Sequence, residues 1–265
     1  MVAIGNDFVV IDNRNGKFQD RIDDFSRFAR VVCARKRSVG ADGLLLLENS
    51  KNADITMRIF NPDGSEVTMC GNGARCIAYY AADKGITGTT LSIETKAGIL
   101  KAQVVNSATR LEMPSPEVLK NRFSLKVGGQ TIEVGFVNTG VPHIVDFVED
   151  LEAVDVKKLG REIRFHKQFT PEGTNANFVK VKDRGTLLIR TYERGVEDET
   201  LACGTGAVAG AIIASEYDYI ESPVRVKTKG GEALFVYFEK IKDKYKEVFL
   251  EGEVKLVYEG RMDYV

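Results

Sequence analysis

The chain has 265 residues, of which 43% are hydrophobic and 28% charged, and its formal net charge is −1. This near-neutral charge excludes the strongly basic surface of most nucleic-acid-binding proteins, and no apolar run is long enough to cross a bilayer. The first residues carry neither a basic leader nor an apolar signal segment, so we expect a cytoplasmic protein. Four cysteines in a chain of this length favour reduced thiols over a disulfide framework.

The first elements in chain order are a strand, a helix and two more strands. Apolar residues at helical spacing predict a helix within Arg21–Arg35. Alternating apolar and polar residues predict a half-buried strand at Ile55–Phe60. The other two strands of this group are expected at Phe8–Asp12 and Gly43–Glu48.

A cysteine before two glycines then introduces a helix that is apolar all round. Cys70 precedes Gly71 and Gly73, and the helix is expected over Ala74–Ala82, ending at Lys84. A helix without a polar face must be buried. The strands that follow are expected at Leu91–Thr95, Ile99–Val105 and Thr109–Met113, before a break at Pro114–Pro116.

The second half of the chain repeats the first. Cys203 lies 133 residues after Cys70 and again precedes two glycines and an apolar helix, Gly206–Ala214. Four more segments match in the same order at offsets of 132 to 135 residues, which indicates a duplication. They are Gly5–Val10 with Gly140–Val145 at 135, Gly40–Leu46 with Gly173–Val179 at 133, Arg58–Asn61 with Arg190–Glu193 at 132, and Thr95–Gly98 with Thr228–Gly231 at 133. The elements expected here are a helix at Val156–Phe165 and strands at Ile144–Phe147, Phe178–Lys182, Leu187–Tyr192, Val224–Thr228, Ala233–Phe238 and Glu247–Leu250.

These observations predict an α+β fold of two pseudo-symmetric domains. Each is expected to be a mostly antiparallel, curled β-sheet or barrel wrapped around its central apolar helix. The domains are expected at residues 1–115 and 116–255, with the tail 256–265 returning to the first domain. In this arrangement the two cysteines would face each other across a cleft.

The chemistry expected of Cys70 and Cys203 is proton transfer. A helix N-terminus favours a thiolate and binds carboxylates through its free N–H groups. Removal of a proton next to a carboxylate builds negative charge there, which such N–H groups stabilise. Two opposed cysteines predict a two-base racemase or epimerase. The alternative is that both are small core residues, as we expect of Cys33 and Cys76.

Other kinds of site are disfavoured. The cysteines and two histidines have no zinc-ligand spacing, so no metal is expected. The glycines of Gly204–Gly210 do not follow a strand directly, and three acidic residues precede them, which argues against a dinucleotide site. His143 and Glu193 are further candidates for the site of the two cysteines. The repeat places His143 at the cleft, and Glu193 follows a strand and precedes a glycine loop. Glu193 corresponds to Asn61, which is also polar and also ends a strand.

The chain resembles the diaminopimelate epimerase family in motifs spread over its whole length. The matching residues are Gly5–Phe8, Phe60–Glu66, Cys70–Cys76, Pro142 with His143, Asn175, Tyr192–Gly195 and Ala202–Gly206. Proline racemase-like relatives of the same fold carry a histidine where this chain has Asn72. The sequence departs from some family members at Val141 and Gly43, which removes a side-chain contact from each of these positions.

The resemblance implies a cofactor-independent epimerase that interconverts L,L- and meso-diaminopimelate in lysine and peptidoglycan biosynthesis, and a homodimer. It implies Cys70 and Cys203 as bases, with His143 and Glu193 tuning the thiol pKa values. The implied substrate contacts are Asn6, Asn61, Asn175, Glu193 and Arg194, with the amides of Gly71, Asn72, Gly204 and Thr205 holding the reacting carboxylate. Two alternatives stay open: a racemase for another amino acid, and a non-catalytic binding protein.

Overall fold

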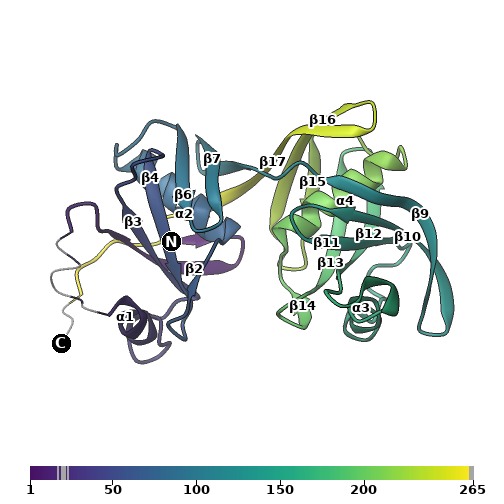
Figure 1. Cartoon of the computed structure of the whole chain (residues 1–265), viewed down its shortest axis with the longest axis horizontal. Helices are drawn as coiled ribbons and strands as arrows, with labels where there is room; N and C mark the ends of the chain where they lie inside the picture. The colour runs from purple at the N-terminus through teal and green to yellow at the C-terminus, as the bar shows by residue number, and fades with distance from the viewer. Residues whose placement is uncertain (17, 19–21, 23, 263–265) are drawn as a thin grey trace. The chain divides into compact units, whose positions relative to one another are not determined.

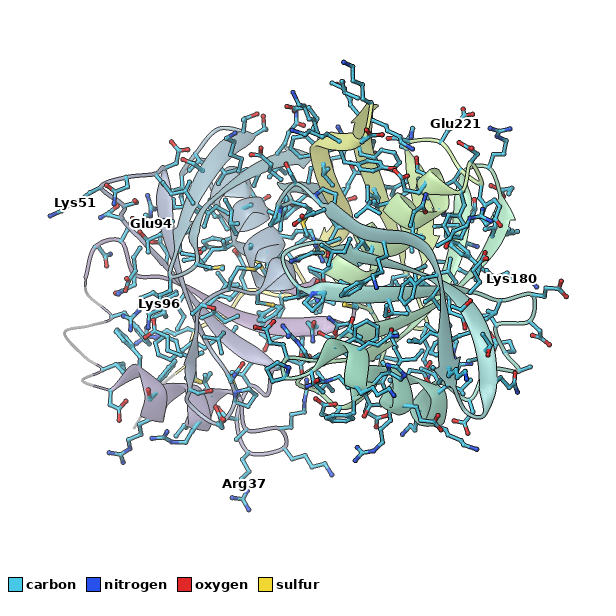
Figure 2. All side chains as sticks on the ribbon, turned by 45° about the vertical axis from the view of Figure 1, so that its right-hand side comes forward. Arg37, Lys51, Glu94, Lys96, Lys180 and Glu221 are labelled. Atoms are coloured by element: carbon cyan, nitrogen blue, oxygen red, sulfur yellow. The ribbon has the colours of Figure 1, made fainter. Side chains whose placement is uncertain are left out.

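The computed structural model describes residues 1–16, 18, 22 and 24–262. Contacts divide the chain into two compact units, unit 1 being Met1–Leu111 with Glu251–Val265, and unit 2 being Glu112–Leu250 (Figure 1). The domain limits expected from the sequence, 1–115 and 116–255, describe the duplicated halves and stay a prediction. Figure 2 shows the charged side chains of Arg37 and Lys51 in unit 1 and Glu221 in unit 2 projecting outward.

The described residues of unit 1 form a closed ring of eight strands. Parallel pairs join β2 to β3 and β4 to β6. The antiparallel neighbours are β1–β2, β1–β17, β3–β4, β6–β7 and β7–β8. The ring closes because β17 pairs with both β1 and β8. Its strands are β1 (Val2–Ala3), β2 (Asn6–Asp12), β3 (Gly43–Glu48), β4 (Ile55–Phe60), β6 (Thr90–Thr95), β7 (Gly98–Val105), β8 (Ala108–Glu112) and the end of β17 (Lys244–Lys255), and the short β5 (Glu66–Val67) pairs with β4.

Unit 2 has the same order of pairing. Strands β9, β10, β11, β12, β13, β15 and β16 are joined in sequence, with β11–β12 and β13–β15 parallel, and β14 adds to β13. Their bounds are β9 (Glu117–Val127), β10 (Gln130–Asn138), β11 (Pro142–Phe147), β12 (Asn175–Asp183), β13 (Thr186–Glu193), β14 (Asp198–Thr200), β15 (Val224–Lys227) and β16 (Ala233–Ile241).

Each sheet wraps around one helix, α2 (Gly71–Asp83) in unit 1 and α4 (Gly204–Glu216) in unit 2 (Figure 1). α2 contacts β1, β2, β3, β4, β6 and β7, and α4 contacts strands from β9 to β16. Ten consecutive residues of α4, Gly206–Ser215, are buried, as their apolar or small side chains require. The predicted fold class, two α+β units each built around an apolar helix, is confirmed.

Two amphipathic helices cover the outside of the sheets. α1 (Phe25–Val32) begins at Asp24, whose carboxylate accepts the amide of Arg27, and α3 (Val156–Arg164) begins at Asp155 in the same way. The short helix η1 (Lys167–Phe169) follows α3. The predicted helix within Arg21–Arg35 is therefore longer than α1, and two of its residues, Arg21 and Asp23, lie outside the described residues.

The sequence did not predict the hairpin of β9 and β10. These long strands carry many exposed polar residues, because only one face of the hairpin packs on the core. β17 is also longer than the four residues expected at Glu247–Leu250, and it runs from unit 2 into unit 1. None of the helices in the described part of the chain is long and apolar enough to span a membrane.

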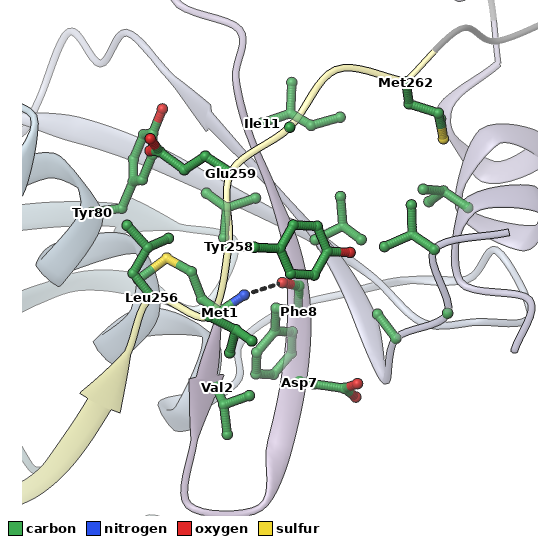
Figure 3. A pocket seen from close by; sticks show the side chains of 18 of the residues that line it. Met1, Val2, Asp7, Phe8, Ile11, Tyr80, Leu256, Tyr258, Glu259 and Met262 are labelled. Atoms are coloured by element: carbon green, nitrogen blue, oxygen red, sulfur yellow. Dashed lines mark hydrogen bonds between the residues drawn. The ribbon is translucent and has the colours of Figure 1, made fainter.

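The tail lies along β2 in unit 1. Glu259 pairs with Lys84 at 2.5 Å, and Ser38 contacts Met262. A cavity of about 630 Å³ remains between the tail, α1 and β2, where the N-terminal amine donates to the carbonyl of Phe8 at 2.8 Å (Figure 3). None of the predicted site residues is among the described residues that line this cavity.

Candidate active site

Cys70 is the residue at which α2 begins. Its backbone is extended, with φ −146° and ψ 120°, and its carbonyl accepts the amide of Ala74. The amides of Gly71, Asn72 and Gly73 belong to the first turn, where a helix has no internal acceptors for them. The thiol is half-buried. Cys70 therefore lies at the positive end of a buried helix, as the sequence predicted.

Polar side chains next to Cys70 form a chain of hydrogen bonds in unit 1. Asn72 donates to the Oδ1 atom of Asn6, and Asn6 donates to Asp42 at 3.2 Å. Arg75, only 1% exposed, donates to the Oδ1 atom of Asn72. The Nη1 atom of Arg75 lies 4.0 Å from where a Cβ on Gly71 would be. The structure thus brings Asn6 and Asn72 together and adds a buried cation below the first turn.

Asn61 is held in a different local structure. It follows β4, and its amide donates to the hydroxyl of Ser65 at 3.0 Å within a tight turn that contains Gly64. Gly64 has a φ of +86°, and a Cβ there would lie 2.5 Å from a backbone oxygen, so only glycine suits this turn. Among the described residues, no recorded hydrogen bond joins Asn61 to Asn6, Asn72 or Cys70.

Cys203 is the residue at which α4 begins, with an extended backbone like that of Cys70. It is 7% exposed, and burial raises the pKa of its thiol to about 12, with the charge of Glu193 adding to this effect. Contacts with Thr205 and the amide of Gly206 lower the pKa but do not outweigh burial. The sequence-based expectation that a helix N-terminus lowers a thiol pKa is therefore wrong for Cys203 in this structure, because burial dominates.

Glu193 ends β13 and faces Cys203. Burial raises the pKa of the Glu193 carboxyl group, while contacts with the side chains of Thr200 and Cys203 lower it. The hydroxyl of Thr205 lies 3.5 Å from the Sγ atom of Cys203. The carbonyl of Thr205 accepts the hydroxyl of Thr139 at 3.2 Å, which fixes the first turn of α4. These residues place a carboxylate and a hydroxyl around one thiol.

Asn175 and Arg194 are joined through the backbone. The amide of Asn175 donates to the carbonyl of Pro142 at 3.0 Å, and its Oδ1 atom accepts the backbone N–H of Arg194 at 2.8 Å. Among the described residues, the guanidinium of Arg194 donates to the carbonyl of Glu172, at 3.4 Å. Asn175 thus orients the loop that carries Arg194, a role that residue type alone does not reveal.

His143 lies in β11 with 0% of its surface exposed. Burial lowers the pKa of its imidazole to about 3, so the ring is neutral at pH 7. Its Nδ1 atom lies 3.1 Å from the amide nitrogen of Asn177, and its Nε2 atom has no hydrogen-bond partner among the described residues. The charge of Arg194 also lowers the pKa of His143, which associates His143 with the same group.

The sequence-based search missed three polar residues of these two groups. Asn177 and Thr191 lie beside Gly206, which follows Cys203 by three residues, and Arg75 lies below Gly71. A signal was present for the first two, since each occupies a strand position whose counterpart in the first half is apolar. A buried arginine inside an apolar helix was the corresponding signal for Arg75.

No metal centre is apparent in the part of the chain that the structure describes, because no three His, Cys, Asp or Glu side chains converge there. The polar groups of both units are instead amides, hydroxyls, a carboxylate and guanidinium groups. This donor set suits an amino acid, whose carboxylates and amines need charged and hydrogen-bonding partners.

Comparison with known proteins identifies the family. The family model of diaminopimelate epimerase matches residues 1–119 and 135–257. The chain is 46% identical to diaminopimelate epimerase of Aquifex aeolicus, covering 97% of this chain and 94% of that protein. It is 42% identical to the enzyme of the same name from Chlorobaculum tepidum, covering 98% of each.

Solved structures with low identity share the fold. A PhzF-family phenazine biosynthesis protein from Bacillus anthracis aligns with a TM-score of 0.69 at 19% identity, over 94% of this chain and 91% of that chain. Methylitaconate-delta-isomerase aligns with a TM-score of 0.66 at 12% identity, over 98% and 93%. The family match, the full-length relatives and the two cysteine-headed helices lead to one conclusion: the chain belongs to the diaminopimelate epimerase family and is an isomerase.

Proposed function

We propose that the chain interconverts L,L- and meso-diaminopimelate without a cofactor, by a two-base mechanism in which Cys70 and Cys203 act on opposite faces of one α-carbon. The observation that carries this proposal is the repeated placement of a cysteine at the first residue of a buried helix. Each helix start offers a thiol and free backbone N–H groups together, and the reaction needs both.

In the proposed reaction a thiolate removes the α-proton and a thiol returns a proton to the other face. The negative charge that develops spreads into the adjacent carboxylate, which the amides of Gly71, Asn72, Gly204 and Thr205 would hold. After one turnover the first cysteine is a thiol and the second a thiolate. Proton exchange with solvent then restores the starting state.

The raised pKa of Cys203 favours one assignment of the starting state. A thiol whose pKa is about 12 keeps its proton at pH 7, so Cys203 would be the proton donor. Cys70, which is only half-buried, would be the base. The starting state would then act on the isomer whose α-hydrogen faces Cys70.

The proposed substrate contacts come from both units. Asn6 and Asn61 of unit 1 and Asn175, Glu193 and Arg194 of unit 2 would bind the amines and carboxylates of diaminopimelate. A guanidinium group suits the distal, non-reacting carboxylate, because it can form two parallel hydrogen bonds with it. This distal recognition would distinguish diaminopimelate from amino acids with a single carboxylate.

The decisive experiment follows hydrogen exchange. Incubation of the chain with L,L-diaminopimelate in deuterated water should give meso-diaminopimelate that carries deuterium at one α-carbon, detected by chiral chromatography with mass spectrometry. Because neither pyridoxal phosphate nor metal is part of the proposal, dialysis against EDTA and hydroxylamine should leave the rate unchanged. Neither exchange nor meso product under these conditions would overturn the proposal.

We also propose that the chain works as a cytoplasmic homodimer. The tail of unit 1 supports this, because Val257 and Tyr258 are 60% and 63% exposed and apolar side chains of this size are seldom left in water together. Sedimentation or light scattering should give about twice the monomer mass. A monomer at micromolar concentration would contradict this part of the proposal.

A further inference from the structure

The duplication lets each buried position of unit 2 be compared with its counterpart in unit 1. Leu44 pairs with Phe60 in unit 1, and Ala176 pairs with Tyr192 in unit 2. Each residue of β3 therefore corresponds to the residue of β12 that lies 132 positions later in the chain. The repeat in the sequence had suggested 133 positions for this strand. His143 corresponds to Phe8, because these residues pair with Asn175 and Gly43 across equivalent parallel strands.

Three buried positions around the helix starts are apolar in unit 1 and polar in unit 2. Phe8, Leu45 and Ile59 belong to the core cluster of unit 1. A Cβ on Gly73 would lie 2.9 Å from Leu45 and 3.4 Å from Ile59. The counterparts in unit 2 are His143, Asn177 and Thr191.

The polar residues of unit 2 pack against α4 in the same way as their apolar counterparts pack against α2. A Cβ on Gly206, the counterpart of Gly73, would lie 2.5 Å from Asn177 Oδ1 and 3.2 Å from Thr191 Oγ1. Unit 1 shows that this fold is stable with apolar residues at these positions. The polar set in unit 2 is therefore not required by the fold, and burying it has a cost that apolar residues avoid.

The hydrogen bonds of Asn177 define the orientation of its amide. The carbonyl of Ile144 can only accept, so the Asn177 atom 2.8 Å from it is the nitrogen Nδ2. The other end of the amide, Oδ1, accepts the hydroxyl of Thr191 at 3.0 Å. Both ends of the side chain are thus fixed by neighbours on β11 and β13.

This orientation determines the tautomer of His143. Nδ2 of Asn177 carries only donors and lies 3.1 Å from His143 Nδ1, so Nδ1 must accept. In a neutral imidazole the proton is then on Nε2. Nε2 is buried and has no partner among the described residues, so in the free protein this N–H donor is available to a ligand.

We infer that Asn177 is a positioning residue that, with Thr191, holds His143 as the neutral Nε2–H tautomer, so that the site presents a hydrogen-bond donor to a carboxylate oxygen of the bound substrate. The inference rests on the proposed function and deepens it, since it assigns His143 the role of a neutral hydrogen-bond donor to the substrate. The nearby charge of Arg194, the proposed partner of a substrate carboxylate, favours a carboxylate as the acceptor.

Nitrogen NMR on the whole chain tests the tautomer directly. The chain has two histidines, so ¹⁵N-histidine labelling gives two sets of ring signals, and His166→Gln assigns them. The expected result is a neutral His143 with its proton on Nε2 throughout pH 6 to 8 in the free protein. A proton on Nδ1, or an imidazolium, would overturn the inference even if the enzyme is active.

Asn177→Asp tests the positioning role. A carboxylate next to Nδ1 accepts a proton, so the NMR pattern should change to Nδ1–H or imidazolium, and kcat/KM for diaminopimelate should fall about tenfold or more because the Nε2–H donor is lost or altered. Asn106→Asp adds the same charge at an exposed position of unit 1 and serves as the control. Thr191→Val, which frees the amide to rotate, should give a mixture of tautomers and a smaller loss.

The outcomes separate the inference from the proposed function. A changed tautomer with unchanged kcat/KM in Asn177→Asp would overturn the positioning role. No turnover by the unmodified chain would overturn the proposed function, and the role with it, while the tautomer of His143 could still be read. Folding of each variant is checked by the dispersion of its amide signals, so loss of structure is recognised separately.

Discussion

The starts of α2 and α4 share one backbone design and differ in the charges placed around the cysteine. At α2 the buried guanidinium of Arg75 lies below the first turn and donates to Asn72, and Cys70 is half-buried. At α4 the carboxylate of Glu193 faces a thiol that is 7% exposed. Five residues after Cys203 stands Val208, where α2 has Arg75.

This difference shows how the two halves of a duplicated fold can come to differ in their chemistry. At the start of α4, burial and the charge of Glu193 both disfavour the thiolate of Cys203, and α2 has no corresponding carboxylate at Asn61. The exchange of His143, Asn177 and Thr191 for Phe8, Leu45 and Ile59 is part of the same divergence. Leu45 and Ile59 pack against Gly73 as Asn177 and Thr191 pack against Gly206, and His143 lies 3.1 Å from Asn177. The backbone was kept while the polar side chains were redistributed.

The largest expected effect comes from removing either thiol. Cys70→Ala and Cys203→Ala should each lower kcat for epimerisation by about 10³-fold, since a two-base reaction needs both groups and one acid–base group contributes roughly 10²–10⁴. Chiral chromatography of the product measures the rate. The buried Cys76, replaced by Ala, serves as the matched control for a thiol in the core of α2. Turnover within tenfold of the unmodified chain in either active-site variant would rule out equal need for both cysteines.

Glu193→Gln should remove the negative charge that lies next to Cys203 and has no counterpart at Cys70. The charge of Glu193 raises the pKa of the Cys203 thiol, so the variant should lower that pKa and move the alkaline limb of the rate profile to lower pH. We expect kcat to fall about 10²-fold, because the carboxylate also contacts the reacting thiol. The pH dependence of kcat/KM measures both. An unchanged alkaline limb would contradict the assignment of Glu193.

Much of this comparison could be predicted from the sequence. The repeated cysteine, glycines and apolar run specified both buried helices, and the position of Glu193 opposite Asn61 in the repeat pointed to a carboxylate that contacts Cys203. These signals are strong because periodicity and capping act locally. The family resemblance then supplied the substrate.

The features that the sequence did not predict depend on tertiary contacts, which cannot be recognised in a single sequence. The hairpin of β9 and β10 was missed because its exposed polar residues hide the strand pattern. The raised pKa of Cys203 was missed because burial outweighs the helix terminus, and burial follows from packing around the whole thiol. Asn177 was missed because its importance lies in which atoms face Ile144 and His143.

Alkylation should sharpen the contrast between the thiols in the free protein. Iodoacetamide at pH 7.5 is expected to modify Cys70 at least about tenfold faster than Cys203, because the thiolate is the nucleophile and Cys203 is buried with a raised pKa. Peptide mass spectrometry over time measures each rate, with the buried Cys33 and Cys76 as internal references. Glu193→Gln should raise the rate at Cys203. Equal rates at Cys70 and Cys203 would remove the proposed asymmetry.

The smallest expected effect concerns stability in acid. Burial lowers the pKa of His143 from 6.5 to about 3, so between these values the unfolded chain binds a proton that the folded chain does not. Stability is therefore present above pH 6.5 and is lost as the pH falls, by up to about 1.4 kcal/mol per pH unit for this one proton. Burial raises the pKa of Asp146 from 3.8 to about 6, which acts in the opposite direction over that window.

His143→Gln isolates the histidine contribution, because glutamine keeps an acceptor for Asn177 and does not titrate. Urea unfolding of the variant and the unmodified chain at pH 7 and pH 4.5 should show a smaller loss of unfolding free energy in the variant. Phe8→Leu, at the counterpart position of unit 1, changes packing without changing a titratable group and should leave the pH dependence as it is. Equal acid lability of His143→Gln and the unmodified chain would mean that the folded protein protonates His143 by pH 4.5, which would contradict the lowered pKa of this histidine.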